Sequence, residues 1–87
     1  MSDVANEAVQ ILVIEDEDDI RNLVVMNLKR AGFDVMSAGN GSDGLSLLRA
    51  HRPPVLLLDL MLPDMSGEEI CATLRSDPDT KGTYVIM

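Results

Sequence analysis

Residues 11–16 read Ile-Leu-Val-Ile-Glu-Asp, four aliphatic residues followed directly by two acids. The aliphatic run is continuous and does not alternate with polar residues, which is typical of a strand covered on both faces in a parallel sheet. Residues 55–59 repeat this arrangement as Val-Leu-Leu-Leu-Asp. Short apolar runs that alternate with helical patterns predict βαβ units, and therefore an α/β fold with a parallel sheet.

Helical spacing and turn residues predict the elements around these two strands. A first helix is expected to begin with Asp18 or Asp19 as its N-cap and to end near Gly32. Its apolar spacing predicts an inner face made by Ile20, Leu23, Val24, Asn27, Leu28 and Ala31. The other elements are predicted to be an edge strand over 33–38, a helix from Ser42 or Asp43 to about His51, a helix that opens at Ser66 or Gly67, and a strand over 83–87.

Composition and charge exclude several classes of function. The chain has 87 residues, a single cysteine and a formal net charge of -8. The acidic excess repels phosphate backbones, so direct contact of this chain with nucleic acid is not expected. Cys71 cannot form an internal disulfide, and no apolar run reaches the roughly 20 residues that span a bilayer. The N-terminus lacks the pattern of a signal peptide, so we expect a cytoplasmic protein without membrane contact.

Three acidic side chains are expected to converge at one edge of the sheet. In an open parallel sheet, ligands bind beyond the carboxyl ends of the strands, where the strand order reverses. If strand 33–38 lies outside strand 11–14, the strands that lead into Glu15 and Asp16 and into Asp59 become neighbours. Carboxylates held this close either retain a proton or share a cation, and oxygen ligands with free positions suit Mg2+. The pattern predicts a Mg2+ site made by Asp16 and Asp59, with Glu15 alongside.

Asp59 is the best candidate for a nucleophile in this site. A carboxylate beside a divalent cation can accept a phosphoryl group, because the cation reduces the repulsion between the two anions. Asp59 follows a stiff, buried strand that would fix its position, whereas Glu15 and Asp16 precede a helix and are better placed as metal ligands.

Two segments resemble the receiver domain of two-component response regulators. Residues 11–17 (Ile-Leu-Val-Ile-Glu-Asp-Glu) resemble its acidic first-strand motif, and residues 56–67 (Leu-Leu-Leu-Asp-Leu-Met-Leu-Pro-Asp-Met-Ser-Gly) resemble its phosphoacceptor strand and the loop that follows. The resemblance implies a flavodoxin-like, three-layer α/β fold over residues 10–87, with a parallel sheet of order 2-1-3-4 and an N-terminal tail at 1–9.

The resemblance also implies roles for individual residues. Asp59 would accept a phosphoryl group from a histidine kinase or a phosphotransfer protein. Asp16 and Asp59 would bind Mg2+, and the backbone carbonyl of Met61 would be a further ligand.

The sequence departs from the family after the fourth predicted strand. Members of the family continue with a Thr or Ser, a fourth helix, a fifth strand that ends in Lys, and a fifth helix. This sequence ends at Met87, and neither Lys29 nor Lys81 matches the family's lysine. We therefore expect a receiver truncated after its fourth strand, with impaired switching on phosphorylation. An exposed edge strand containing Ile86 and Met87 is expected to drive formation of a homodimer, or of an oligomer that exchanges elements between chains.

Other functions are compatible with the same residues. Taken alone, the acidic run at 15–19 could be only the solvated start of a helix. A small Mg2+-dependent phosphatase would also use a strand-terminal Asp, but such enzymes commonly carry a second acid two residues later, where this chain has Met61. An interaction module without phosphorylation would use the apolar surface instead. The resemblance favours a signalling phosphoacceptor, not an enzyme, with at most phosphorylation and dephosphorylation of its own Asp59.

Overall fold

The computed structural model describes residues 8–87, and residues 1–7 of the expected N-terminal tail lie outside them. The described elements are, in chain order, β1 (Gln10–Ile14), α1 (Asp18–Arg30), β2 (Asp34–Ala38), α2 (Gly41–His51), β3 (Val55–Leu58), α3 (Gly67–Ser76) and β4 (Tyr84–Ile86). Every element expected from the sequence is present, and the ends differ from expectation by only a residue or two. None of the described helices has the length and apolar content needed to span a bilayer.

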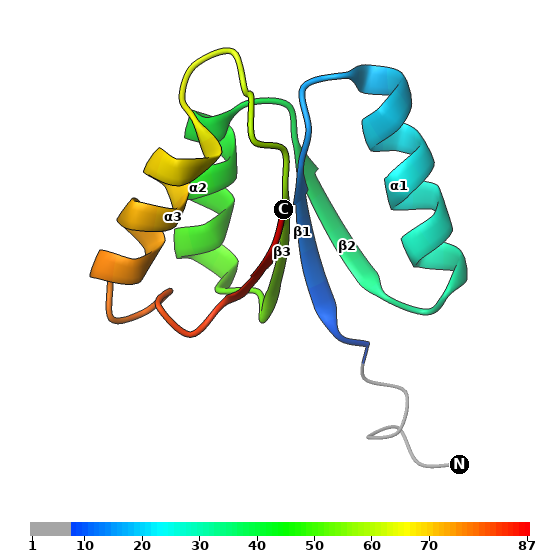
Figure 1. Cartoon of the computed structure of the whole chain (residues 1–87). Coiled ribbons are helices and arrows are strands. Elements are labelled where there is room, and N and C mark those ends of the chain that lie inside the picture. Colours follow the sequence, from blue (N-terminus) through cyan, green and yellow to red (C-terminus); the bar gives the residue numbers. More distant parts are fainter. Residues whose placement is uncertain (1–7) are drawn as a thin grey trace.

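The four strands form one parallel sheet of order β2-β1-β3-β4, as expected. In the register of the sheet, Ile14 at the end of β1 lies opposite Ala38 of β2 and opposite Leu58 of β3. The chain leaves β1 toward β2 on one side and then returns to β3 on the other side, so the strand order reverses beside β1. The carboxyl ends of β1 and β3 therefore lie next to each other (Figure 1).

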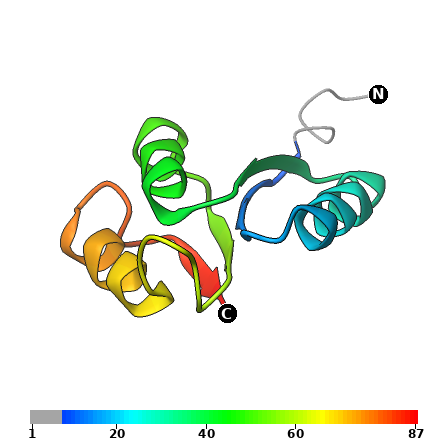
Figure 2. The ribbon, with the colours of Figure 1, turned by 90° about the horizontal axis from the view of Figure 1, so that it is seen from above.

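The sheet lies between two layers of helices (Figure 2). α1 covers one face, and α2 and α3 cover the opposite face. This arrangement confirms the flavodoxin-like, three-layer fold. The core is formed by buried aliphatic side chains of the sheet, α2 and α3, namely Leu12, Ile14, Leu45, Leu48, Leu56, Leu58, Ile70 and Leu74.

The face that α1 turns toward the sheet differs from the expected one. No residue of α1 is buried. The prediction was wrong for Ile20, Leu23, Asn27 and Ala31, which are exposed. The prediction was right for Val24 and Leu28, which are partly buried, and Arg21 and Val25, which lie further round the helix, are partly buried as well. The reason is tertiary: α1 packs mainly against β1 and β2, and a hollow lies between Val24 of α1 and Ile86 of β4.

The start of α1 also differs from expectation. Its N-cap is Glu17, whose side chain makes no capping hydrogen bond, so the prediction of Asp18 or Asp19 was wrong. Both aspartates lie in the first turn instead, where negative charge stabilises the positive end of the helix dipole.

The starts of α2 and α3 are capped by side chains. Oδ1 of Asn40 accepts the N–H of Asp43 at 2.8 Å at the start of α2. At the start of α3, Ser66 accepts the N–H of Glu69 while the Glu69 side chain accepts the N–H of Ser66, which is a capping box. The expected opening of α3 at this serine is confirmed.

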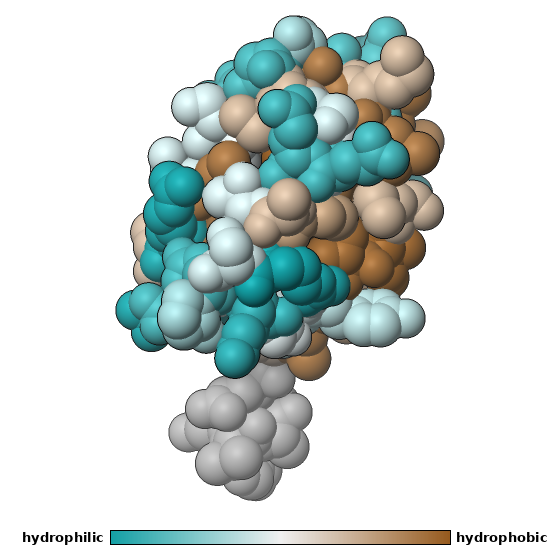
Figure 3. Space-filling model, turned by 60° about the vertical axis from the view of Figure 1, so that its left-hand side comes forward, coloured by the Kyte–Doolittle hydropathy of each residue, from teal (hydrophilic) through white to brown (hydrophobic). Residues whose placement is uncertain are grey.

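Apolar side chains gather on one side of the surface. In Figure 3 they lie along the right-hand side of the view, toward the β4 edge of the sheet, while hydrophilic residues dominate the left-hand side. β4 pairs only with β3 within the described chain. Tyr84, Ile86 and Met87 are 68%, 47% and 65% exposed, so the expected exposure of the last two is confirmed.

Candidate functional site

Three acidic side chains meet at the carboxyl ends of β1 and β3. The last residues of these strands, Ile14 and Leu58, lie opposite each other, and the N–H of Asp59 donates to the carbonyl of Ile14 at 3.0 Å. One carboxylate oxygen from each of Glu15, Asp16 and Asp59 lies within 4.8 Å of the other two. The strand order therefore brings together the same three acids that the sequence pattern placed at one edge of the sheet.

Glu15 shows the electrostatic consequence of this crowding. Partial burial raises the pKa of Glu15 above its ordinary value of 4.5, and the charge of Asp59 and hydrogen bonding with Asp59 and Asp16 raise it further. The N–H of Glu17, which donates to the Glu15 carboxylate at 3.1 Å, partly opposes the shift. A divalent cation between these carboxylates would relieve their repulsion.

The loop after β3 orients Asp59. The N–H of Met61 donates to Oδ1 of Asp59 at 3.2 Å. The loop is closed at its base by an antiparallel bridge between Met61 and Ser66, and by the N–H of Gly67, which donates to the carbonyl of Leu60 at 3.0 Å. A Cβ at position 67 would lie 3.1 Å from Cα of Leu60, so glycine permits this close approach. The Met61 side chain is 83% exposed, and it is the backbone of Met61 that contacts Asp59.

Arg21 is a residue beside the site that the sequence reasoning missed. Its guanidinium donates to the backbone carbonyl of Glu15 at 2.8 Å and to the carboxylate of Asp18 at 2.6 Å. These bonds tie the segment between β1 and α1 to the helix. The three-residue spacing from Asp18 to Arg21 on a helix indicates that these two side chains can form an ion pair. The contact with the Glu15 carbonyl had no such signal, because it depends on how the backbone turns after β1.

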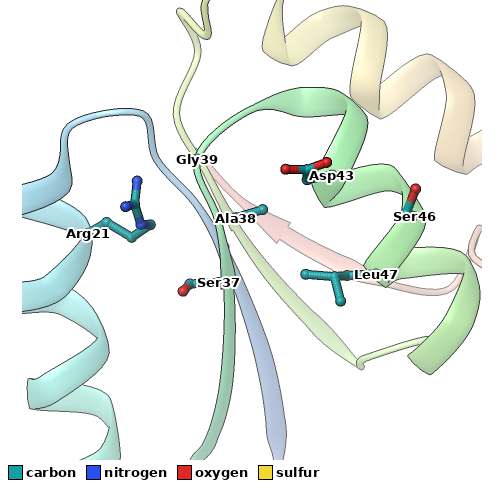
Figure 4. A pocket seen from close by; sticks show the side chains of 7 residues that line it. All are labelled: Arg21, Ser37, Ala38, Gly39, Asp43, Ser46 and Leu47. Carbon is teal, nitrogen blue, oxygen red and sulfur yellow. The ribbon is translucent and has the colours of Figure 1, made fainter.

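Two hollows flank the sheet. The larger, of about 520 Å³, lies beside β2 with Arg21 of α1 and Asp43 of α2 in its lining (Figure 4). None of the three clustered acids lines it. The smaller, of about 210 Å³, has a mainly apolar lining that includes Val24 and Ile86, and it reaches Glu15 and Asp59. The acidic site therefore opens onto the apolar hollow between α1 and the β4 edge.

The two lysines lie away from the acids. Lys29 is in the last turn of α1, which leads into the start of β2. Lys81 is in the turn that leads into β4. Since the strands are parallel, their starts are at the opposite edge of the sheet from Glu15, Asp16 and Asp59.

Fold and site together define a class of protein: an open, parallel α/β protein with an acidic site where the strand order reverses. The chain belongs to the response regulator receiver domain family, whose profile matches residues 11–87.

Curated relatives match most of this chain. Transcriptional regulatory protein AfsQ1 of Streptomyces coelicolor is 46% identical over 65 residues, which are 75% of this chain and 29% of the relative. DNA-binding response regulator MtrA of Mycolicibacterium smegmatis is 41% identical over 78 residues, which are 90% of this chain and 33% of the relative. The chain thus spans about a third of the length of these relatives.

Solved structures share the fold. The chemotaxis response regulator CheY4 of Vibrio cholerae superposes with a TM-score of 0.87 at 28% identity, over 91% of this chain and 66% of that one. The N-terminal domain of a response regulator receiver protein from Methanoculleus marisnigri gives a TM-score of 0.83 at 34% identity, over 87% of this chain and 62% of that one.

Proposed function

We propose that this chain is a phosphoacceptor of two-component signalling and that Asp59 receives the phosphoryl group. The observation that carries the proposal is the cluster of Glu15, Asp16 and Asp59 at the switch point of a receiver fold. The donor would be the phosphohistidine of a histidine kinase or of a phosphotransfer protein, which are the partners of receiver domains. In this role the chain is a signalling protein whose only chemistry is on its own Asp59.

The same cluster is the proposed Mg2+ site. Asp16 and Asp59 would supply carboxylate oxygens, Glu15 would lie alongside, and the backbone carbonyl of Met61 would be a further ligand. Carboxylate and carbonyl oxygens with open positions for water suit Mg2+. Burial is the main reason that the pKa of Glu15 is raised, but the charge of Asp59 contributes, and a cation would relieve that repulsion. When bound, the ion would neutralise part of the phosphoryl charge.

Asp59 would act as the nucleophile. One carboxylate oxygen forms a bond to phosphorus while the bond from phosphorus to the imidazole nitrogen of the donor breaks, and the imidazole regains a proton from water. The backbone of β3 and the N–H of Met61 hold this carboxylate in place, which reduces the motion that must be frozen out before reaction.

Intact-mass spectrometry tests the phosphoacceptor role. After incubation with Mg2+ and acetyl phosphate, the chain is expected to carry one alkali-labile phosphoryl group, and Asp59→Ala is expected to carry none. Asp43→Ala removes a carboxylate outside the cluster and is expected to behave as the unmodified chain does. A folded chain that gains no adduct would instead favour an interaction module, and steady hydrolysis of a phosphomonoester would favour a phosphatase.

We also propose that two copies of the chain associate through the outer edge of β4. The N–H of Tyr84 donates to the carbonyl of Pro54 at 2.8 Å, so alternation along the strand turns the N–H and carbonyl of Val85 away from β3. Two copies related by a two-fold axis would pair these strands antiparallel. Such pairing covers Ile86 and places the two acidic sites at opposite ends of the joined sheet, where they do not repel each other.

A cytoplasmic location without direct nucleic-acid contact completes the proposal. A lone cysteine suits a reducing compartment, and a net charge of -8 repels phosphate backbones.

A further inference from the structure

Asp64 joins the loop after β3 to the start of α2. Its Oδ1 accepts the N–H of Gly41 at 2.7 Å, and its Oδ2 accepts the N–H of Ser42 at 2.9 Å. These two hydrogen bonds lower the pKa of Asp64 below its ordinary value of 3.8. We refer to this pair of hydrogen bonds as the loop–helix contact. It connects segments that are more than 20 residues apart in sequence.

The two segments fit closely where they meet. Gly41 is buried, and a Cβ there would lie 2.3 Å from Cγ and 2.7 Å from Sδ of Met65. A side chain at position 41 would therefore displace the Met65 side chain, and its Cβ would also lie 3.2 Å from Oδ1 of Asp64. The glycine and the carboxylate at position 64 thus act on the same junction, one by leaving space and the other by hydrogen bonding.

Asp64 adds to the capping of α2, because it accepts the N–H groups of Gly41 and Ser42, whereas the N-cap side chain satisfies only the N–H of Asp43. The side chain of Asn40 accepts the N–H of Asp43, and the carboxylate of Asp43 adds negative charge to the first turn of the helix. Asp64 also attaches the outer part of the loop to α2. The Met61–Ser66 bridge closes the base of the same loop. The loop is held at both places, and Met61, which forms one side of the bridge, donates its N–H to Asp59.

We propose that Asp64 is a positioning residue for the phosphoacceptor site. Through the loop–helix contact it holds the loop so that the backbone of Met61 stays against the carboxylate of Asp59. This inference rests on the proposed function for its activity readout, but it also makes a structural claim that can be measured without phosphorylation. The alternative is that Asp64 only stabilises the N-terminus of α2.

Amide hydrogen exchange measured by NMR tests the structural claim. Asp64→Ala is expected to speed exchange of the Met61 amide by roughly threefold or more, because the loop opens more often without its outer attachment. Asp64→Asn keeps an acceptor oxygen in the same place and is expected to retain most of the protection. The matched control is Asp43→Ala, which removes a carboxylate from the same helix start without touching the loop. Unchanged exchange at Met61 in Asp64→Ala would overturn the inference.

The rate of phosphorylation by acetyl phosphate at saturating Mg2+ tests the consequence. Asp64→Ala is expected to slow it by roughly threefold or more, below the roughly 10- to 100-fold typical of residues that contact a metal ligand directly. Asp64→Asn is expected to recover most of the rate, and Asp43→Ala to change it by less than about twofold. Gly41→Ala is expected to slow the reaction as well, by crowding Met65 from the other side of the junction.

The outcomes separate this inference from the proposed function. A normal rate in Asp64→Ala together with a lower urea midpoint would show that Asp64 is only a structural cap. Faster Met61 exchange in Asp64→Ala, with no adduct on the unmodified chain, would overturn the phosphoacceptor role while leaving the positioning of the Met61 backbone established.

Discussion

The three clustered acids differ in their surroundings. Glu15 and Asp59 are partly buried, whereas Asp16 is exposed. An exposed carboxylate keeps its hydration, so Asp16 suits an ion that retains several waters, while Asp59 lies deeper and is held by Met61. Each acid therefore has a separate expected role, and single substitutions can distinguish them.

Neutralising either proposed carboxylate ligand is expected to weaken Mg2+ binding. Asp16→Asn and Asp59→Asn each remove one unit of negative charge from beside the ion, which is worth about 1 kcal/mol or more at contact distance, or about fivefold or more in affinity. Isothermal titration calorimetry measures the change, with Asp43→Asn as the control. Equal affinity in all four chains would rule out this metal site.

Asp64 predicts a pH dependence of stability. Its pKa is lower in the folded chain than its ordinary value of 3.8, because the N–H groups of Gly41 and Ser42 donate to the charged form. The stabilisation is complete above the unfolded pKa and is lost as the pH falls through the folded pKa. On acidification from neutral pH to below 3.8, the urea midpoint of the unmodified chain should fall more than that of Asp64→Asn, as followed by circular dichroism. An equal fall in both chains would show that the contact does not distinguish the two protonation states.

Among the elements, α1 is the least embedded helix. The periodicity of its apolar residues predicted the helix, but the inner face that it predicted includes Ile20 and Leu23, which are exposed. The apolar residues of α1 extend over more than one face, so periodicity alone does not decide which of them meets the sheet. The capping box of Ser66 and Glu69 was readable because it depends on residues only three apart. In the acidic run at 15–19 every residue can cap or charge the helix start, so local preference did not identify Glu17.

The packing of α1 predicts unequal effects of two leucine substitutions. Leu23 in α1 is 54% exposed, and Leu48 in α2 is 1% exposed. Leu23→Ala is expected to lower the free energy of unfolding by less than about 1 kcal/mol, and Leu48→Ala by about 2–5 kcal/mol. Urea denaturation gives both values. Similar losses of unfolding free energy in the two variants would contradict the exposed position of Leu23 in α1.

At the scale of the whole molecule, polarity is divided between two sides. The acids lie at the carboxyl edge of the sheet, and the apolar hollow with Ile86 lies next to them, between α1 and β4. In the proposed dimer, negative charge would keep a second copy away from the acidic site, and the apolar surface and open edge of β4 would bind it. The division explains why association through β4 is compatible with a net charge of -8.

A charge on the β4 edge is expected to prevent association. Ile86 is 47% exposed, so Ile86→Lys can be accommodated in the monomer, but in the proposed dimer two lysines would be brought together across the axis. Sedimentation velocity at micromolar concentrations should show a dimer for the unmodified chain and a monomer for the variant. Ala72→Lys, at an exposed position of α3, is the control and should remain dimeric. A monomeric unmodified chain would remove the basis for this proposal.

The sequence by itself determined the strands, the helices and the identity of the three acids. Continuous aliphatic runs specify buried parallel strands, and acids directly after such runs must lie at the carboxyl edge, since the direction of a parallel strand sets the edge at which it ends. Only the tertiary structure decided which flank of α1 is covered, how Arg21 reaches the Glu15 carbonyl, and that Asp64 meets the start of α2. Those contacts join residues on separately packed elements. Their distances depend on how the helices and loops settle on the sheet, and no local spacing in the sequence encodes that geometry.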